Sequence, residues 1–190
     1  MQLNDYFSRL ARYHAWATRR LLADDLAALG DAEWHRDLGL FFGSVHRTAN
    51  HLLVTDGIWF ARFAEGTSPR IPLDAQPHAE RAPLCAALAA AADRWAGWID
   101  GLDPARLDGE LAYVRNNGEA VRLPFAPALG HAFNHATHHR GQITAAVTAL
   151  GRPGPSLDWV YLLQEEARTA ARADPMPPAD RPHPPAEASP

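Results

Sequence analysis

The chain has 190 residues, of which 47% are hydrophobic, and carries a formal net charge of −4. This composition indicates one packed globular domain, and a net negative charge is not typical of a protein that binds nucleic acid. The one cysteine, Cys85, excludes an internal disulfide and a multi-thiolate metal site within one chain. No apolar run approaches the roughly 20 residues of a membrane span, and the N-terminus has no apolar signal core. We therefore expect a cytoplasmic protein with neither a membrane nor a nucleic-acid partner.

Apolar residues recur with a helical period through most of the chain. The segments that we expect to be helical are about 3–29, 44–64, 82–101, 126–150 and 156–171. Gly30 ends the first of them, and Ser44 is a suitable N-cap for the second, after an apolar connector at 38–42. The glycine and prolines of residues 65–77 predict a loop, and the glycines and prolines that begin at Gly151 end the fourth helix.

Between the third and fourth helices the period of the apolar residues changes to two. Leu111 and Tyr113 alternate on one side of a turn at Asn117, and Val121 and Leu123 alternate on the other. This pattern predicts a small β-hairpin, with an irregular loop as the alternative.

These elements predict an all-α fold, an up-down four-helix bundle with a small β-hairpin and an extra C-terminal helix. We expect the bundle to occupy residues 1–172. Residues 173–190 form a proline-rich tail, because seven prolines fall among the last 16 residues and no apolar pattern accompanies them.

Four histidines and a glutamine share one face of the expected fourth helix. At about 100° per residue and with His131 at zero, Gln142 lies near 20°, His135 near 40°, His138 near −20° and His139 near 80°. Their neighbours on this helix are apolar, so we expect the stripe to be partly buried. Burying polar imidazoles costs free energy unless they bind a ligand or a hydrogen-bond partner. Neutral imidazole is a common ligand of zinc, nickel and iron, and the alternative is a set of hydrogen-bonded packing histidines.

A helix can offer a metal two ligands that lie one turn apart. The pairs that satisfy this spacing are His131 with His135, His135 with His138, and His135 with His139. His131 and His138 lie two turns apart, roughly 10 Å along the axis, so they cannot easily bind one ion together. His135 occurs in every pair and is the first candidate.

The third ligand has to come from another helix. His51 on the expected second helix, beside the apolar Leu52, is the best supplier, and His46 and His14 are alternatives. Neither His131 nor His135 is followed by the glutamate that a helical zinc protease uses as its base, so a zincin mechanism is not expected.

Three segments resemble the DinB/YfiT-like family of metal-dependent proteins. Residues 10–17 resemble the family's opening Tyr-Asn-x-Trp-Ala helix, with His14 where Asn is usual. Residues 51–59 look like its His-x4-Asp-x2-Trp pattern, and residues 134–142 match its most specific motif nearly residue for residue. The three segments come in the family's order, and the resemblance covers roughly residues 1–170.

The resemblance implies a four-helix bundle, often a homodimer, with zinc or nickel held by His51, His135 and His139. It places Gln142 on the pocket side as a candidate catalytic residue that could orient a substrate or a bound water. His14 stays open as a fourth ligand. Asp56 and Asp158 are possible acceptors for ligand imidazoles, although Asp158 fits better as an acid at the start of the last helix.

Three neutral histidines with a free position are typical of a catalytic rather than a structural zinc site. Some members of the resembled superfamily are maleylpyruvate isomerases and S-transferases that use low-molecular-weight thiols. We therefore expect a metal-dependent enzyme that activates a thiol or water against a small electrophilic substrate, a thiol transferase, isomerase or hydrolase. The alternative is a non-catalytic, stress-associated protein whose metal is structural, which a shell closed by His14 or Asp56 would favour.

Overall fold

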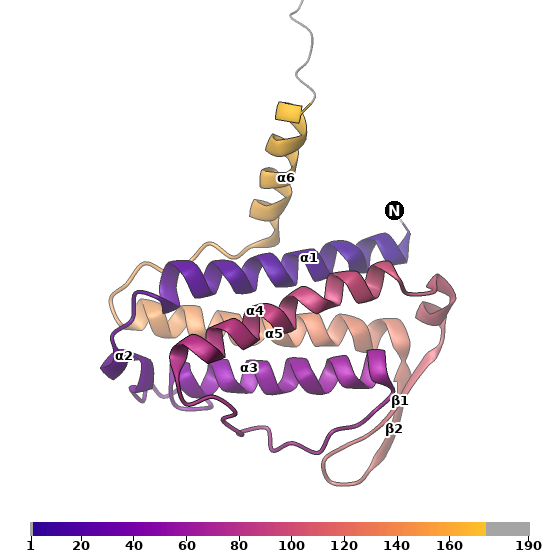
Figure 1. Ribbon diagram of the computed structural model, residues 1–190, viewed down its shortest axis with the longest axis horizontal. Helices are drawn as coiled ribbons and strands as arrows, with labels where there is room; N and C mark the ends of the chain where they lie inside the picture. Colours follow the sequence, from indigo (N-terminus) through magenta and orange to yellow (C-terminus); the bar gives the residue numbers. More distant parts are fainter. Residues whose placement is uncertain (1, 174–190) are drawn as a thin grey trace, which may run out of the picture. The chain divides into compact units, whose positions relative to one another are not determined.

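A computed structural model describes residues 2–173, so the expected tail lies outside the described residues from position 174 onward (Figure 1). The elements are α1 (Leu3–Leu21), η1 (Leu22–Leu26), α2 (Asp31–His35), α3 (Val45–Phe60), η2 (Ala61–Glu65), α4 (Arg81–Asp100), η3 (Pro104–Asp108), β1 (Glu110–Val114), β2 (Ala120–Pro124), α5 (Phe125–Ala149) and α6 (Trp159–Ala173). The predicted all-α fold with one hairpin and a C-terminal helix is confirmed. Among the described residues, no helix is long and apolar enough to cross a membrane.

Four long helices form the bundle. α1 contacts α4 and α5, and α3 contacts the same two helices, so the four close into a ring around the core (Figure 1). Two clusters of buried apolar side chains fill it, one including Phe133 and the other including Ala136. On α5, His135 lies between these two residues, and His139 follows one turn later. Helix α6 belongs to a second compact unit that begins at Asp158.

The predicted hairpin is confirmed. β1 and β2 pair antiparallel, with Leu111 opposite Leu123 and Tyr113 opposite Val121. Gly118 in the turn has a φ of +89°, a conformation that glycine adopts at no steric cost.

The loop between η2 and α4 lies between the hairpin and α3. Ser68 accepts a hydrogen bond from the backbone of β1, and Ile71 accepts one from the side chain of Asn116 in the hairpin turn. Further along, the carbonyls of Leu73 and His78 bond to side chains of α3. The loop is thus anchored at both ends, and one of its carbonyls reaches a histidine of the candidate site.

Two details of the helix prediction were wrong. The first helix ends as an α-helix at Leu21, and the chain continues as one π-helical turn, η1, in which Leu26 remains buried. The short elements α2 and η3 were not predicted. Each has five residues, too few for a period to show, although α2 buries Trp34. The predicted cap at Ser44 is confirmed, because its side chain accepts from the backbone N–H of Arg47.

Candidate metal centre

Three histidines from two helices converge inside the bundle. The Nε2 atom of His139 lies 3.1 Å from Nε2 of His51 on α3 and 3.1 Å from Nε2 of His135, one turn earlier on α5. One ring nitrogen from each residue lies within 4.8 Å of the other two. His51 and His139 are buried and His135 is half-buried. We refer to these three residues as the histidine centre.

The outer ring nitrogens determine which inner nitrogens carry protons. Nδ1 of His51 lies 2.7 Å from the carbonyl oxygen of Leu73, and Nδ1 of His139 lies 2.8 Å from Oε1 of Gln142. Both oxygens can only accept, so both Nδ1 atoms donate their protons and both Nε2 atoms present lone pairs. The amide of Gln142 is held in this orientation because its nitrogen bonds to Nε2 of His138 at 3.1 Å.

Two lone pairs that face each other at 3.1 Å repel, and a cation between them would remove that repulsion. Nitrogen ligands of a tetrahedral zinc, at bond lengths of about 2.0–2.1 Å, lie about 3.3–3.4 Å apart. Small movements of the rings would therefore convert the observed geometry into a coordination geometry. The residues fit the divalent ion that the sequence resemblance implies.

The electrostatics keep the three rings neutral, as metal ligation requires. Burial, followed by the neighbouring imidazoles His139 and His51, lowers the pKa of His135 to about 3. Burial also lowers the pKa of His139 to about 4, although its hydrogen bond to Gln142 raises it, and burial lowers the pKa of His51. All three rings are therefore neutral near neutral pH, and the inner nitrogens of His51 and His139 carry no proton.

His14, considered as a fourth ligand, lies in a different cluster. Its Nε2 donates to Oδ2 of Asp56 at 2.9 Å, and its Nδ1 accepts from Nη1 of Arg140 at 2.9 Å. Asp56 also accepts from the indole N–H of Trp95 at 3.0 Å and from Arg94 at 2.9 Å. We call these five residues the His14 network.

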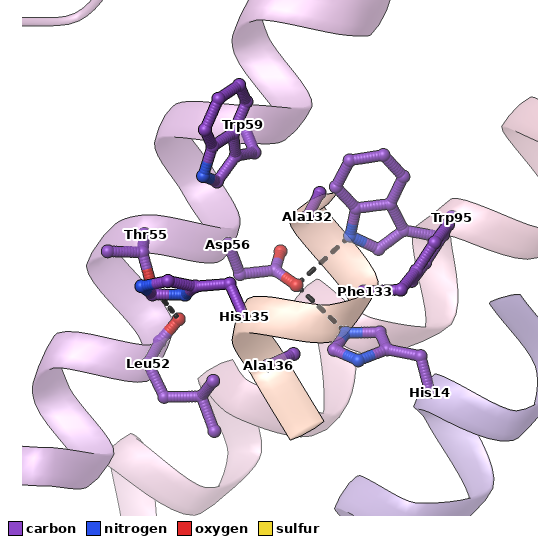
Figure 2. A pocket seen from close by; sticks show the side chains of 10 residues that line it. All are labelled: His14, Leu52, Thr55, Asp56, Trp59, Trp95, Ala132, Phe133, His135 and Ala136. Carbon is purple, nitrogen blue, oxygen red and sulfur yellow. Dashed lines mark hydrogen bonds and ion pairs between the residues drawn. The ribbon is translucent and has the colours of Figure 1, made fainter. Parts of the chain in front are cut away.

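The expectation that Asp56 would accept from a ligand imidazole is wrong in this structure. Figure 2 shows its carboxylate pointing toward His14 and Trp95 and away from the ring of His135. A small cavity of about 10 Å³ lies among these side chains, at the lower limit for one water molecule. Asp158 directly precedes α6. The backbone N–H of Tyr161 donates to the carbonyl oxygen of Asp158 at 3.0 Å, as expected for a residue at the start of a helix.

The other candidate histidines do not join the centre. Nε2 of His46 donates to the carbonyl of His78 at 3.0 Å, beside the ring of Trp34. His131 is exposed and its ring lies 5.1 Å from that of Trp59, while His138 is exposed and contacts Gln142. Of the three pairs with suitable spacing, the structure thus brings His135 and His139 to His51.

Two contacts of the centre were not predicted. The ring of Phe42 stacks on that of His51 with centroids 3.9 Å apart, and the carbonyl of Leu73 orients His51. Phe42 comes from the apolar connector and Leu73 from the proline-containing loop. Neither segment has a period that could have revealed the contact.

A pocket of about 490 Å³ opens beside the centre. Its lining residues are His51, Thr55, Ile58, Trp59, Arg62, Leu73, Tyr113, Arg115, Asn116, Asn117, His131 and His135. They come from α3, η2, the hairpin, the loop after η2 and α5. The volume is in the range of sites for small molecules, roughly 300–1,000 Å³, and two residues of the histidine centre form part of its wall.

Comparison with known proteins agrees with this architecture. The model of the DinB family matches residues 1–172. The chain is also 22% identical over 178 residues to Protein DinB of Bacillus subtilis (strain 168), a match that covers 88% of this chain and 100% of that protein. No solved structure matches the chain significantly. The long match to the family model shows that this chain is a member of the DinB family.

Proposed function

We propose that the chain binds one divalent metal ion through His51, His135 and His139 and uses it to activate a thiol or water against a small electrophilic substrate. The observation that carries the proposal is the pair of unprotonated Nε2 atoms of His51 and His139, 3.1 Å apart. Each is held toward the other by a hydrogen bond on the far side of its ring. Zinc and nickel both suit imidazole nitrogen.

The residues of the chain hold the ligands and admit the substrate. The carbonyl of Leu73 and the amide of Gln142 orient the rings of His51 and His139. When bound, a divalent ion held by three neutral ligands would keep its full charge and lower the pKa of a coordinated thiol or water. The pocket wall formed by His51 and His135 gives a small molecule access to that position.

The donor set favours an enzyme over a protein whose metal only clamps helices. Structural zinc sites usually have four protein ligands, whereas catalytic ones leave a position open. Among residues 2–173, the group of possible ligand atoms at the centre has three members. His14 and Asp56, which could have closed the shell, bond to each other instead.

The attacking group would come from outside the chain. Burial raises the pKa of the Cys85 thiol on α4, which makes it a poor nucleophile near neutral pH. A low-molecular-weight thiol or water bound at the open position is the alternative that the pocket allows. Gln142, expected as a catalytic residue, contacts His139 and His138, and we assign it the role of positioning His139.

Cobalt substitution tests the proposal. We expect Co²⁺ to bind with one equivalent per chain, and 2-mercaptoethanol or cysteine to produce a thiolate-to-cobalt charge-transfer band that is absent in His135→Ala. His131→Ala, the matched variant one turn earlier on α5, should keep the band. A cobalt site whose spectrum is unchanged by every thiol and by hydroxide between pH 6 and 9 would contradict an open position and support the structural alternative.

A further inference from the structure

The pocket beside the histidine centre is lined by cations without a matching acid among the residues that the structure describes. Two arginines, Arg62 of η2 and Arg115 beyond β1, line it, and no aspartate or glutamate of residues 2–173 does. Arg115 pairs with Glu119 at 3.0 Å, and both side chains are more than half exposed. Exposed pairs of this kind are weak and leave much of the charge available.

Arg62 is the better-placed cation of the two. Its guanidinium carbon lies 4.7 Å from the ring centroid of Trp59 and 4.1 Å from that of Tyr113, so two aromatic rings hold it. Its Nε is buried and has no hydrogen-bond partner, and no ion pair of Arg62 occurs among the described residues. Arg62 is therefore a partly buried guanidinium, fixed in orientation, with unused donors.

Arg62 remains charged in this position. Burial lowers the pKa of its guanidinium, Tyr113 raises it and the nearby Arg115 lowers it. The ordinary value lies so far above neutrality that the group still carries its proton at pH 7. Two positive charges, those of Arg62 and Arg115, line the same pocket and together favour the binding of an anion there.

The remaining wall is suited to an apolar body. Ile58, Trp59 and Leu73 line the pocket together with the arginines. His51 and His135 line the same pocket, so a ligand whose anionic end meets Arg62 would have its other end in the pocket that borders the histidine centre.

We propose that this pocket binds small molecules with a carboxylate group on a short apolar body, the carboxylate bonded to Arg62 and the apolar body against Trp59 and Ile58. A guanidinium matches a carboxylate with two parallel hydrogen bonds, which gives orientation as well as affinity. The role of the carboxylate in directing a reacting carbon to the centre rests on the proposed function. The anion site itself rests on Arg62 and its pocket.

Isothermal titration of the full chain with trans-cinnamate, and with the neutral cinnamamide as control probe, tests this assignment. We expect the metal-free protein to bind cinnamate and to bind cinnamamide at least about tenfold more weakly, because the neutral amide loses the charge-assisted hydrogen bonds to the guanidinium. Arg62→Gln should lose at least about tenfold in cinnamate affinity, and Arg62→Lys should restore part of it. Arg122→Gln removes the same charge from β2 outside the lining and should bind as the unaltered chain does.

The outcomes separate this inference from the proposed function. Equal binding of cinnamate and cinnamamide, or unchanged cinnamate affinity in Arg62→Gln, would overturn the anion site. Cinnamate binding that requires zinc, disappears in His135→Ala and survives in Arg62→Gln would place the carboxylate on the metal, which refutes this inference and leaves the metal centre standing. Binding that needs Arg62 in a chain that takes up no metal would support the anion site while the proposed function fails. Circular dichroism and zinc content of Arg62→Gln, both expected to be unchanged, show that the variant is folded.

Discussion

The bundle contains two buried clusters built around histidines, and they differ in how their ring nitrogens are satisfied. In the His14 network, one nitrogen of His14 donates to Asp56 and the other accepts from Arg140, so the ring has no unused capacity. In the histidine centre, the outer nitrogens of His51 and His139 are bonded to oxygens, while the inner nitrogens face each other. A buried histidine thus indicates a metal ligand only when its inner nitrogen lacks a partner of opposite polarity.

The charges of the two clusters differ in the same way. The network contains a carboxylate, Asp56, whose side chain is 6% exposed, together with the guanidinium groups of Arg94 and Arg140. Burial lowers the pKa of His14 although its hydrogen bond to Asp56 raises it. A neutral imidazole therefore links the carboxylate of Asp56 to the buried guanidinium of Arg140. Within residues 2–173, the centre has no carboxylate among its possible ligand atoms, and its own rings lower one another's pKa. The first cluster is complete by itself, whereas the second would be completed by the cation of the proposed function.

The largest expected effect comes from removing the acid of the complete cluster. Asp56→Ala removes the direct partner of the partly exposed Arg94 and the carboxylate that His14 links to the buried Arg140. It should destabilise the protein by about 3–5 kcal/mol, as for other broken buried ion pairs. Urea denaturation with a chelator present measures it without a contribution from metal.

Asp93→Ala is the matched control, because Asp93 pairs with Arg19 where both side chains are about half exposed. It should cost about 0–1 kcal/mol. If Asp56→Ala and Asp93→Ala unfolded at the same urea concentration, the network would not be the stabilising unit that its burial suggests.

Metal should stabilise the centre and leave the network unaffected. Zinc at 100-fold excess over its Kd should stabilise the fold by about 2.7 kcal/mol, which corresponds to roughly 5–10 °C in Tm for a domain of this size. Differential scanning calorimetry with zinc and then with EDTA measures the shift, which should vanish in His139→Ala and persist in His131→Ala. A shift retained by His139→Ala would show that the pair on α5 is wrongly assigned.

The metal-free centre should lower stability in acid. The pKa values of His135 and His139 are lowered to about 3 and about 4 in the folded state, and unfolding returns them to about 6.5. The unfolded chain therefore binds more protons below pH 6.5, so the stability present above that pH is lost progressively down to pH 3–4.

The slope identifies the centre as the source of this loss. Each full proton taken up contributes about 1.4 kcal/mol per pH unit, and these partly exposed rings contribute less. His135→Gln should flatten the curve of unfolding free energy between pH 6.5 and 4. An unchanged slope would mean that His135 titrates normally in the folded protein.

The smallest effect is expected at the residue that orients a ligand. Gln142→Ala removes the acceptor for Nδ1 of His139 and should weaken metal binding by about 10–100-fold, as other losses of ligand-orienting groups do. His138→Ala removes the contact that orients the same amide but leaves that acceptor in place, so it should weaken metal binding less than Gln142→Ala does. Competition with a chromophoric chelator measures both, and equal affinities in Gln142→Ala and the unaltered chain would refute the positioning role.

The periodic parts of the fold could be predicted from the sequence, and the short parts could not. The long helices and the hairpin bury one face each, and that burial imposes the spacing of their apolar residues. α2 and η3 are single turns whose positions depend on what they pack against. Trp34 in α2 is 1% exposed, but a segment of five residues is too short for its sequence pattern to predict this burial.

The face of the site could be predicted, but spacing alone could not decide which pair meets His51. The pairs His131–His135 and His135–His139 have identical spacing on α5. The packing of α3 against α5 distinguishes them, because it brings His51 to His139 and Trp59 to His131. The pocket could not be predicted from the sequence for the same reason, because Arg62 and Tyr113 come into contact only when the hairpin packs on η2.

X-ray absorption of the zinc-loaded protein, combined with its metal content, is the decisive measurement of whether the histidine centre is a metal site. We predict one zinc per chain with three imidazole nitrogens at about 2.0–2.1 Å and a remaining position filled by solvent or added thiol. We also predict a metal content well below one per chain in each of His51→Ala, His135→Ala and His139→Ala. No saturable zinc binding, or a full equivalent retained when all three histidines are replaced together, would contradict it.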